Sequence, residues 1–139
     1  MANASTERMT PAEVVRLARR ESCDGIAWTT TEPALWWPFV IETSRLARQA
    51  GLFVVMVTNG FYEQGALAEI LPWLDVWRVD LKAWSDEAYR EWLGSGRVEA
   101  PAALVRQRTL EAARAGVHVE ALTCVIPGLH DRSDDLARL

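Results

Sequence analysis

The hydrophobic positions along this chain of 139 residues fall into two alternating patterns. Apolar residues spaced three and four apart, which are typical of amphipathic helices, are separated by short runs rich in β-branched and aromatic residues, which are typical of strands. The helical spacing covers residues 11–23, 35–50, 64–74, 86–92, 101–115 and the stretch from 133 onward. The strand pattern covers residues 26–31, 52–57, 76–83 and 117–126.

This order predicts an α/β protein with a parallel sheet, because strands separated by helices of this length form right-handed βαβ units. Residues 52–57 are continuously apolar, as in a strand that is buried on both faces. Four strands do not close a barrel, for which about eight are usual. We therefore expect an internal part of a larger α/β barrel over residues 10–139, truncated at both ends, after a flexible tail of residues 1–9.

Composition narrows the classes of function and location. The net charge of −4, with both signs interspersed, argues against a nucleic-acid partner, which would require clustered basic residues. No apolar run approaches the roughly 18 residues of a membrane span, and the N-terminus lacks the apolar core of a secretory signal. We therefore expect a cytoplasmic protein with no membrane partner, in which Cys23 and Cys124 are reduced and buried.

Polar residues or glycine turns follow every predicted strand. In parallel α/β folds, ligands bind at the carboxyl ends of the strands, and these ends converge on one edge of the sheet. The candidate site residues at these ends are Thr30, Thr31, Glu32, Thr58, Asn59, Asp80, Lys82, Ile126 and Gly128. A local explanation also exists, because turns between strands and helices favour Thr, Asn, Asp and Gly by themselves.

The third predicted strand separates apolar from charged side chains. Alternation places Trp77, Val79 and Leu81 on one face of the strand and Arg78, Asp80 and Lys82 on the other. The charged face either lines the interior of a barrel, where a ligand would meet it, or is the solvated face of an edge strand. Lys82 is also a candidate Schiff-base lysine of an aldolase-like barrel, provided that it lies in a desolvated pocket.

Other side chains near the strand ends carry two interpretations each. Glu32 stands between a strand and a helix. Its carboxylate can bind an amino group of a ligand, or it can interact with the positive N-terminal end of the helix dipole. His118 and Glu120 share one face of the last strand, and without a third ligand nearby we interpret them as a structural pair rather than a metal site. Trp36 and the neighbouring tryptophans indicate packing anchors or a hydrophobic mouth.

Five segments carry a resemblance to a known family. In order along the chain they are MTPAEVVRLA, IAWTTTEPALWW, VTNGF, VWRVDLKAWSDEAYR and HVEALTCVIPGLHD. The ordered set resembles the radical S-adenosylmethionine (radical SAM) enzymes, most closely the group of pyruvate formate-lyase activating enzyme and the AmmeMemoRadiSam proteins. The resemblance implies a parallel (βα)6 partial TIM barrel, of which this chain would supply about four strands.

The resemblance also implies a role for each candidate residue. Thr30, Thr31 and Glu32 stand where the family carries a Gly-Gly-Glu-type motif that holds the amino end of S-adenosylmethionine. Thr58 and Asn59 stand beside the cofactor, and Asp80 and Lys82 correspond to an inward pair at its methionine carboxylate. Ile126 and Gly128 belong to a turn that supports its adenine. In the family, a 4Fe–4S cluster donates one electron to S-adenosylmethionine, which releases methionine and a 5′-deoxyadenosyl radical.

The sequence departs from the family pattern in three respects. The CxxxCxxC motif, whose thiolates bind the cluster, is absent, and Cys23 and Cys124 are too far apart in sequence to replace it. Val57 stands where activating enzymes carry an aspartate beside a bound cation. Thr30 and Thr31 replace glycines, which narrows the approach of a ligand to the backbone.

We therefore expect a radical SAM core that binds S-adenosylmethionine but holds no metal and no catalytic residue of its own. The cluster would be present only in a complete form of the protein, and this chain alone would be inactive. The substrate, a protein or a small molecule, stays unidentified. Two alternatives remain open from the sequence: a non-catalytic half-barrel that pairs with another chain through open sheet edges, and a lyase or aldolase that depends on Lys82.

Overall fold

The computed structural model describes residues 7–128, 131 and 133–137, which form one α/β unit with a parallel sheet. The elements follow one another as α1 (Pro11–Arg20), β1 (Gly25–Trp28), the 3-10 turn η1 (Pro33–Trp36), α2 (Trp37–Gln49), β2 (Phe53–Thr58), α3 (Gln64–Ile70), the 3-10 turn η2 (Leu71–Trp73), β3 (Val76–Asp80), α4 (Asp86–Leu93), α5 (Pro101–Arg114), β4 (His118–Leu122) and α6 (Ser133–Leu136). The predicted alternation of helices and strands is confirmed.

The four strands lie in the order β1-β2-β3-β4, and every neighbouring pair is parallel. Sequential strands are therefore sheet neighbours, as a slice through a βα barrel requires. The register pairs Trp28 with Met56 and Asp80 with Leu122, so the carboxyl ends of all four strands lie along one edge. The predicted parallel sheet is confirmed.

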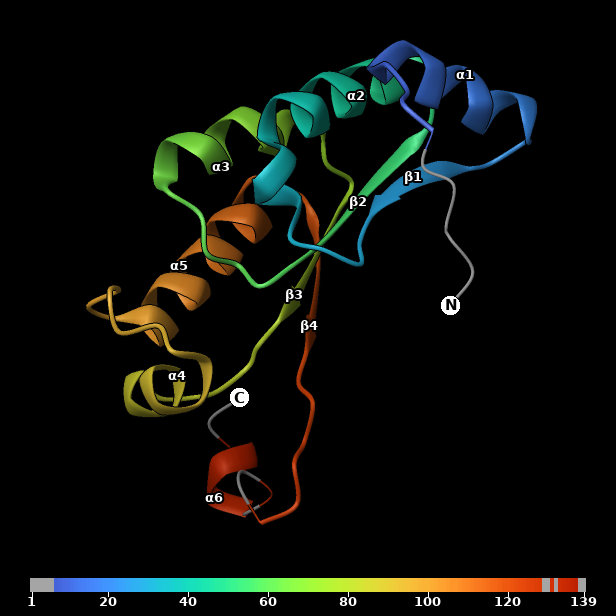
Figure 1. The fold of residues 1–139 in the computed structure, drawn as a ribbon. Helices are drawn as coiled ribbons and strands as arrows, with labels where there is room; N and C mark the ends of the chain where they lie inside the picture. Colours follow the sequence, from blue (N-terminus) through green and yellow to red (C-terminus); the bar gives the residue numbers. More distant parts are fainter. Residues whose placement is uncertain (1–6, 129–130, 132, 138–139) are drawn as a thin grey trace.

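Helices α1–α5 lie on one side of this sheet, and no other described element covers its opposite face, here called the open face (Figure 1). Alternate strand residues follow this division: Met56 and Trp77 are fully buried beneath the helices, whereas Val55 and Val57 on the other face are half-buried. The expectation that residues 52–57 are buried on both faces is therefore wrong. A single helical layer covers one face only, and within the described residues no second layer covers the other.

Three strands are shorter than their sequence pattern, and among them the pattern of residues 76–83 gives a strand only over Val76–Asp80. The pattern of residues 26–31 gives a strand only over Gly25–Trp28, and that of residues 117–126 only over His118–Leu122. A strand persists while a neighbour pairs with it. Because β3 ends at Asp80, opposite Leu122, the chain beyond Leu122 has no ladder to continue and runs away from the sheet (Figure 1).

Both cysteines are free thiols, and both are exposed, so the expected burial of Cys23 and Cys124 is wrong. Cys23 lies in the turn between α1 and β1, and Cys124 lies beyond the end of β4. Neither position is beneath the helical layer that forms the core. None of the helices in the described part of the chain is long and apolar enough to cross a bilayer.

Candidate functional site

The carboxyl ends of β1, β2 and β3 border an open cavity of about 380 Å³, here called the rim cavity. Its lining residues are Thr29, Thr30, Thr31, Glu32, Val57, Thr58, Asn59, Asp80 and Lys82. Seven of the nine candidate site residues therefore come together, although they lie on three segments of the chain. Ile126 and Gly128 follow β4 and are not among the residues that line this cavity.

Glu32 forms the hydrogen-bonded centre of the rim cavity. Its Oε1 atom accepts a hydrogen bond from Thr58 Oγ1 at 2.7 Å, and its Oε2 atom accepts one from the backbone N–H of Asn59 at 2.9 Å. Glu32 precedes η1, but its side chain makes no capping hydrogen bond to that turn. The structure therefore does not support the interpretation in which the Glu32 carboxylate interacts with the N-terminus of the following helical turn.

The turn after β2 is fixed by its own side chains. Thr58 is buried, and its Oγ1 accepts the N–H of Gly60 at 3.1 Å, while Asn59 Oδ1 accepts the N–H of Phe61 at 2.9 Å. Gly60 has φ +80°, and a Cβ atom there would lie 2.9 Å from Val105 Cγ1. The same turn conformation therefore satisfies the local preference of Thr, Asn and Gly for turns and places Thr58 and Asn59 at the rim cavity.

Tyr62 is a functional candidate that the sequence analysis missed. Its side chain is 3% exposed, and its hydroxyl donates a hydrogen bond to Glu32 Oε1 at 2.6 Å. Burial, and next the hydrogen bond to Glu32, raise the pKa of the Tyr62 phenol far above its ordinary value, so the group stays a hydrogen-bond donor. The sequence offers no signal for this contact, because Tyr62 lies in a loop and reaches Glu32 only through the fold.

Asp80 and Lys82 lie on the open face of the sheet, as alternation along β3 predicts. Lys82 Nζ is 2.6 Å from Asp80 Oδ2, and each side chain is 39% exposed. On the same face, Arg78 Nη1 is 3.5 Å from Glu120 Oε2, so Glu120 pairs with a cation of the next strand. The charged side chains on this face therefore form ion pairs with one another. Such a surface suits a polar ligand that carries both a positive and a negative group.

Thr30 adopts φ +79°, the left-handed region that β-branched residues rarely occupy. This conformation costs a threonine about 1–2 kcal/mol. Only a strong requirement for the turn geometry makes such a conformation tolerable.

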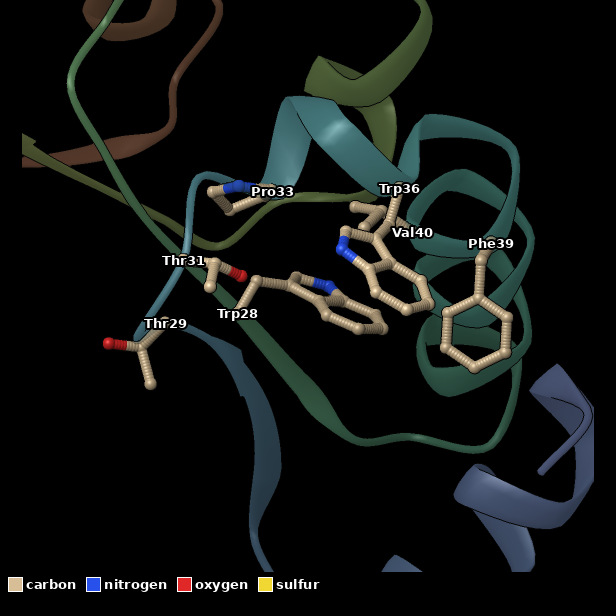
Figure 2. Close-up of a pocket in the computed structure, with 7 residues that line it drawn as sticks. All are labelled: Trp28, Thr29, Thr31, Pro33, Trp36, Phe39 and Val40. Atoms are coloured by element: carbon tan, nitrogen blue, oxygen red, sulfur yellow. The ribbon is translucent and has the colours of Figure 1, made fainter. Parts of the chain in front are cut away.

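An aromatic pocket of about 160 Å³ adjoins the rim cavity and shares Thr29 and Thr31 with it. Figure 2 shows the indole ring of Trp28 beside the indole ring of Trp36 and the phenyl ring of Phe39. Trp28 is held in place because its Nε1 donates to Ser44 Oγ at 3.0 Å. Trp36 is 63% exposed, so the expected hydrophobic mouth lies beside the polar site.

A parallel sheet with helices on one face is the architecture of the βα-barrel class, in which ligands bind at the carboxyl edge of the sheet, where the rim cavity lies here. The sequence model of the radical SAM superfamily matches residues 3–139, and the chain belongs to that superfamily.

Two individual proteins are similar to this chain, one in sequence and one in fold. The chain is 36% identical over 128 residues to "Uncharacterized protein MJ0808" of Methanocaldococcus jannaschii, with 92% of this chain and 36% of that protein covered. The chain therefore spans about a third of that relative's length. Its fold is similar to a domain of pyruvate-formate lyase-activating enzyme from Bacteroides vulgatus, with a TM-score of 0.65 and 17% identity over 81% of this chain and 66% of the other.

The residues present do not fit a 4Fe–4S cluster. Such a cluster needs closely grouped cysteine thiolates, whereas Cys23 and Cys124 lie on separate exposed segments. Within residues 7–128, 131 and 133–137, no three His, Cys, Asp or Glu side chains gather as a metal site would require. The donors of the rim cavity do fit the zwitterionic methionine end of S-adenosylmethionine, which needs a carboxylate for its ammonium group and a cation for its carboxylate.

Proposed function

We propose that this chain forms the S-adenosylmethionine-binding part of a radical SAM enzyme that cleaves this cofactor reductively. The observation that carries the proposal is the rim cavity, which brings Glu32, Asp80 and Lys82 together from the ends of two non-adjacent strands and their loops. Membership of the superfamily supplies the general expectation of S-adenosylmethionine as cofactor. Within the superfamily we assign the chain to the AmmeMemoRadiSam type, on the five segments quoted above.

Each part of the cofactor has a proposed partner. The Glu32 carboxylate receives the ammonium group, and the Lys82 ammonium receives the carboxylate, with Asp80 holding Lys82 in place at 2.6 Å. Thr30 and Thr31 border the methionine end, and Thr58 and Asn59 orient Glu32. The turn of Ile126 and Gly128 is assigned to the adenine side, which lies beyond the lining of the rim cavity.

The electron for cleavage has to come from a cluster that the described residues do not bind. S-adenosylmethionine binding is therefore the activity that this chain contributes, and we propose that the chain alone is inactive in cleavage. Anaerobic reconstitution with iron and sulfide tests this part. The expected result is no stable cluster, and a stable 4Fe–4S protein that cleaves S-adenosylmethionine would overturn it.

Isothermal titration calorimetry with S-adenosylmethionine tests the binding proposal directly. We expect saturable binding at one site, and we expect Glu32→Gln to weaken it by about tenfold, because the ammonium loses a charged acceptor. Glu42→Gln is the matched control, since Glu42 pairs with Arg45 on α2, away from the rim cavity. Absence of binding to the wild-type chain, or equal effects of both variants, would refute the proposal.

The open face of the sheet supports a second candidate, a half-barrel that associates with another chain. Phe53 is 57% exposed, and Val55 and Val57 are only half-buried. Analytical ultracentrifugation tests this second candidate, because a monomer at micromolar concentration contradicts association of the chain with itself. The structure gives no support to the aldolase alternative: a Schiff-base lysine is desolvated, whereas Lys82 is 39% exposed and paired with Asp80.

A further inference from the structure

We infer that Tyr62 is a positioning residue, whose hydroxyl fixes the Glu32 carboxylate so that Oε2 stays available to the amino group of a ligand. This inference rests on the proposed function for the nature of the ligand, and on the geometry of four residues for the positioning itself. Tyr62 does not line the rim cavity, so it would act through Glu32 and not by contact with the ligand.

The two oxygens of Glu32 have different numbers of donors. Oε1 receives two hydroxyl groups, from Tyr62 at 2.6 Å and from Thr58 at 2.7 Å. Oε2 receives one donor among the described residues, the Asn59 N–H at 2.9 Å. A carboxylate has about four acceptor sites, two on each oxygen. Oε1 is therefore saturated by the protein, and the remaining site is on Oε2.

Tyr62 is itself held at its ring by two indoles and at its backbone by an arginine. The indole rings of Trp37 and Trp77 lie with their centroids 5.4 Å from that of Tyr62, one tilted and one edge-on. Arg108, which is 7% exposed, donates its Nε–H to the backbone carbonyl oxygen of Tyr62 at 2.7 Å. Arg108 is in turn bonded through Nη1 to both carboxylate oxygens of Glu111, at 2.8 and 2.9 Å.

A rigid donor makes a better positioning group than a mobile one, because the rotamer entropy of Tyr62 has already been lost on folding. Burial, and next the hydrogen bond to Glu32, raise the pKa of the Tyr62 phenol, so the hydroxyl is a proton donor at neutral pH. The Glu32 carboxylate lies at a strand-to-turn junction, and among the described residues it is held by the hydroxyls of Thr58 and Tyr62 and by the backbone N–H of Asn59. Loss of the phenol should therefore release the carboxylate without unfolding the loop.

The Asn59 amide gives a readout that requires no ligand. In Tyr62→Phe, we expect its hydrogen exchange, measured by NMR, to accelerate about fivefold to tenfold, because one hydrogen bond that orders its acceptor is lost. The Phe61 amide, which bonds to Asn59 Oδ1 in the same turn, should be unchanged. Equal acceleration of both amides would show general loosening of the turn, and no change at Asn59 would show that Tyr62 does not hold Glu32. Either result overturns the inference.

Thr43→Val is the matched control for removal of a buried hydroxyl. Thr43 is fully buried on α2, and its Oγ1 has no hydrogen-bond partner in the described part of the chain. This variant should leave the Asn59 amide and the affinity for S-adenosylmethionine unchanged. A change at Asn59 as large as that in Tyr62→Phe would contradict a specific role of Tyr62.

Calorimetry with S-adenosylmethionine supplies the second readout. Tyr62→Phe should weaken binding about fivefold to tenfold, and should have no further effect in the Glu32→Gln background, because Tyr62 acts only through Glu32. Additive effects of the two substitutions would refute the inference. If the wild-type chain does not bind S-adenosylmethionine, the proposed function fails, and the Asn59 amide alone decides the role of Tyr62.

Discussion

Asp80 and Lys82 stand two residues apart at the end of β3, with Lys82 Nζ 2.6 Å from Asp80 Oδ2 on the open face of the sheet. Alternation along the strand places both side chains on this face. Because each side chain is 39% exposed, the pair contributes little to stability, and its charges remain available to a ligand.

The first prediction follows from this pair. Lys82→Met should weaken binding of S-adenosylmethionine about tenfold or more, because the methionine carboxylate loses a charged partner. The free energy of unfolding, measured in urea, should change by less than about 1 kcal/mol. Arg78→Met is the control, since Arg78 forms a comparable pair with Glu120 on the same face and does not line the rim cavity. Equal losses of affinity in both variants would point to the net charge of the face as the cause.

The second prediction concerns the strained turn after β1. Thr30→Gly should raise the free energy of unfolding by about 1 kcal/mol, because glycine removes the cost of φ +79° and this gain exceeds the added entropy of the unfolded chain. Thr31→Gly, at a neighbouring position without a positive φ, should lower it instead. Chemical denaturation of the three proteins checks this, and a destabilised Thr30→Gly variant would contradict the account of strain.

The third prediction tests the one-sided core. Met56→Ala should cost about 2–5 kcal/mol of unfolding free energy, because Met56 is fully buried beneath the helices. Val57→Ala, at the next position of the same strand but on the open face, should cost markedly less. Equal costs in urea denaturation would mean that the open face is covered in solution.

The fourth prediction concerns alkaline pH. The pKa of Tyr62 in the folded chain is raised above its ordinary value of 10.0, so the folded state retains its proton where the unfolded state loses it. The stability that this provides is complete below pH 10 and falls above it, by about 1.4 kcal/mol for each pH unit. Tyr62→Phe should show a shallower loss of unfolding free energy between pH 10 and 11 than the wild type.

Tyr89 provides the comparison for the alkaline experiment. Burial raises the pKa of Tyr89 as well. The backbone N–H of Lys82 donates to the Tyr89 hydroxyl at 3.2 Å, and this hydrogen bond lowers the pKa and so offsets part of the rise. Tyr89→Phe should therefore reduce the alkaline slope by a smaller amount than Tyr62→Phe. Identical slopes in the wild type and both variants would show that other groups govern the loss of stability.

The sequence by itself determined the order of elements, the parallel sheet and most of the rim. Period-two alternation placed Arg78, Asp80 and Lys82 on one face of β3, and the turn residues Thr58 and Asn59 marked a strand end. These features depend on local backbone geometry, which neighbouring residues specify.

Only the tertiary structure decided how Glu32 is held and which face of the sheet is covered. Tyr62 lies 30 positions from Glu32, and the exposed state of Cys124 depends on where the ladder of β3 ends. Such contacts arise from packing between segments distant in sequence, and no local pattern encodes them. The strands and the rim therefore follow from periodicity, whereas the hydrogen bonds that orient the rim follow from the fold.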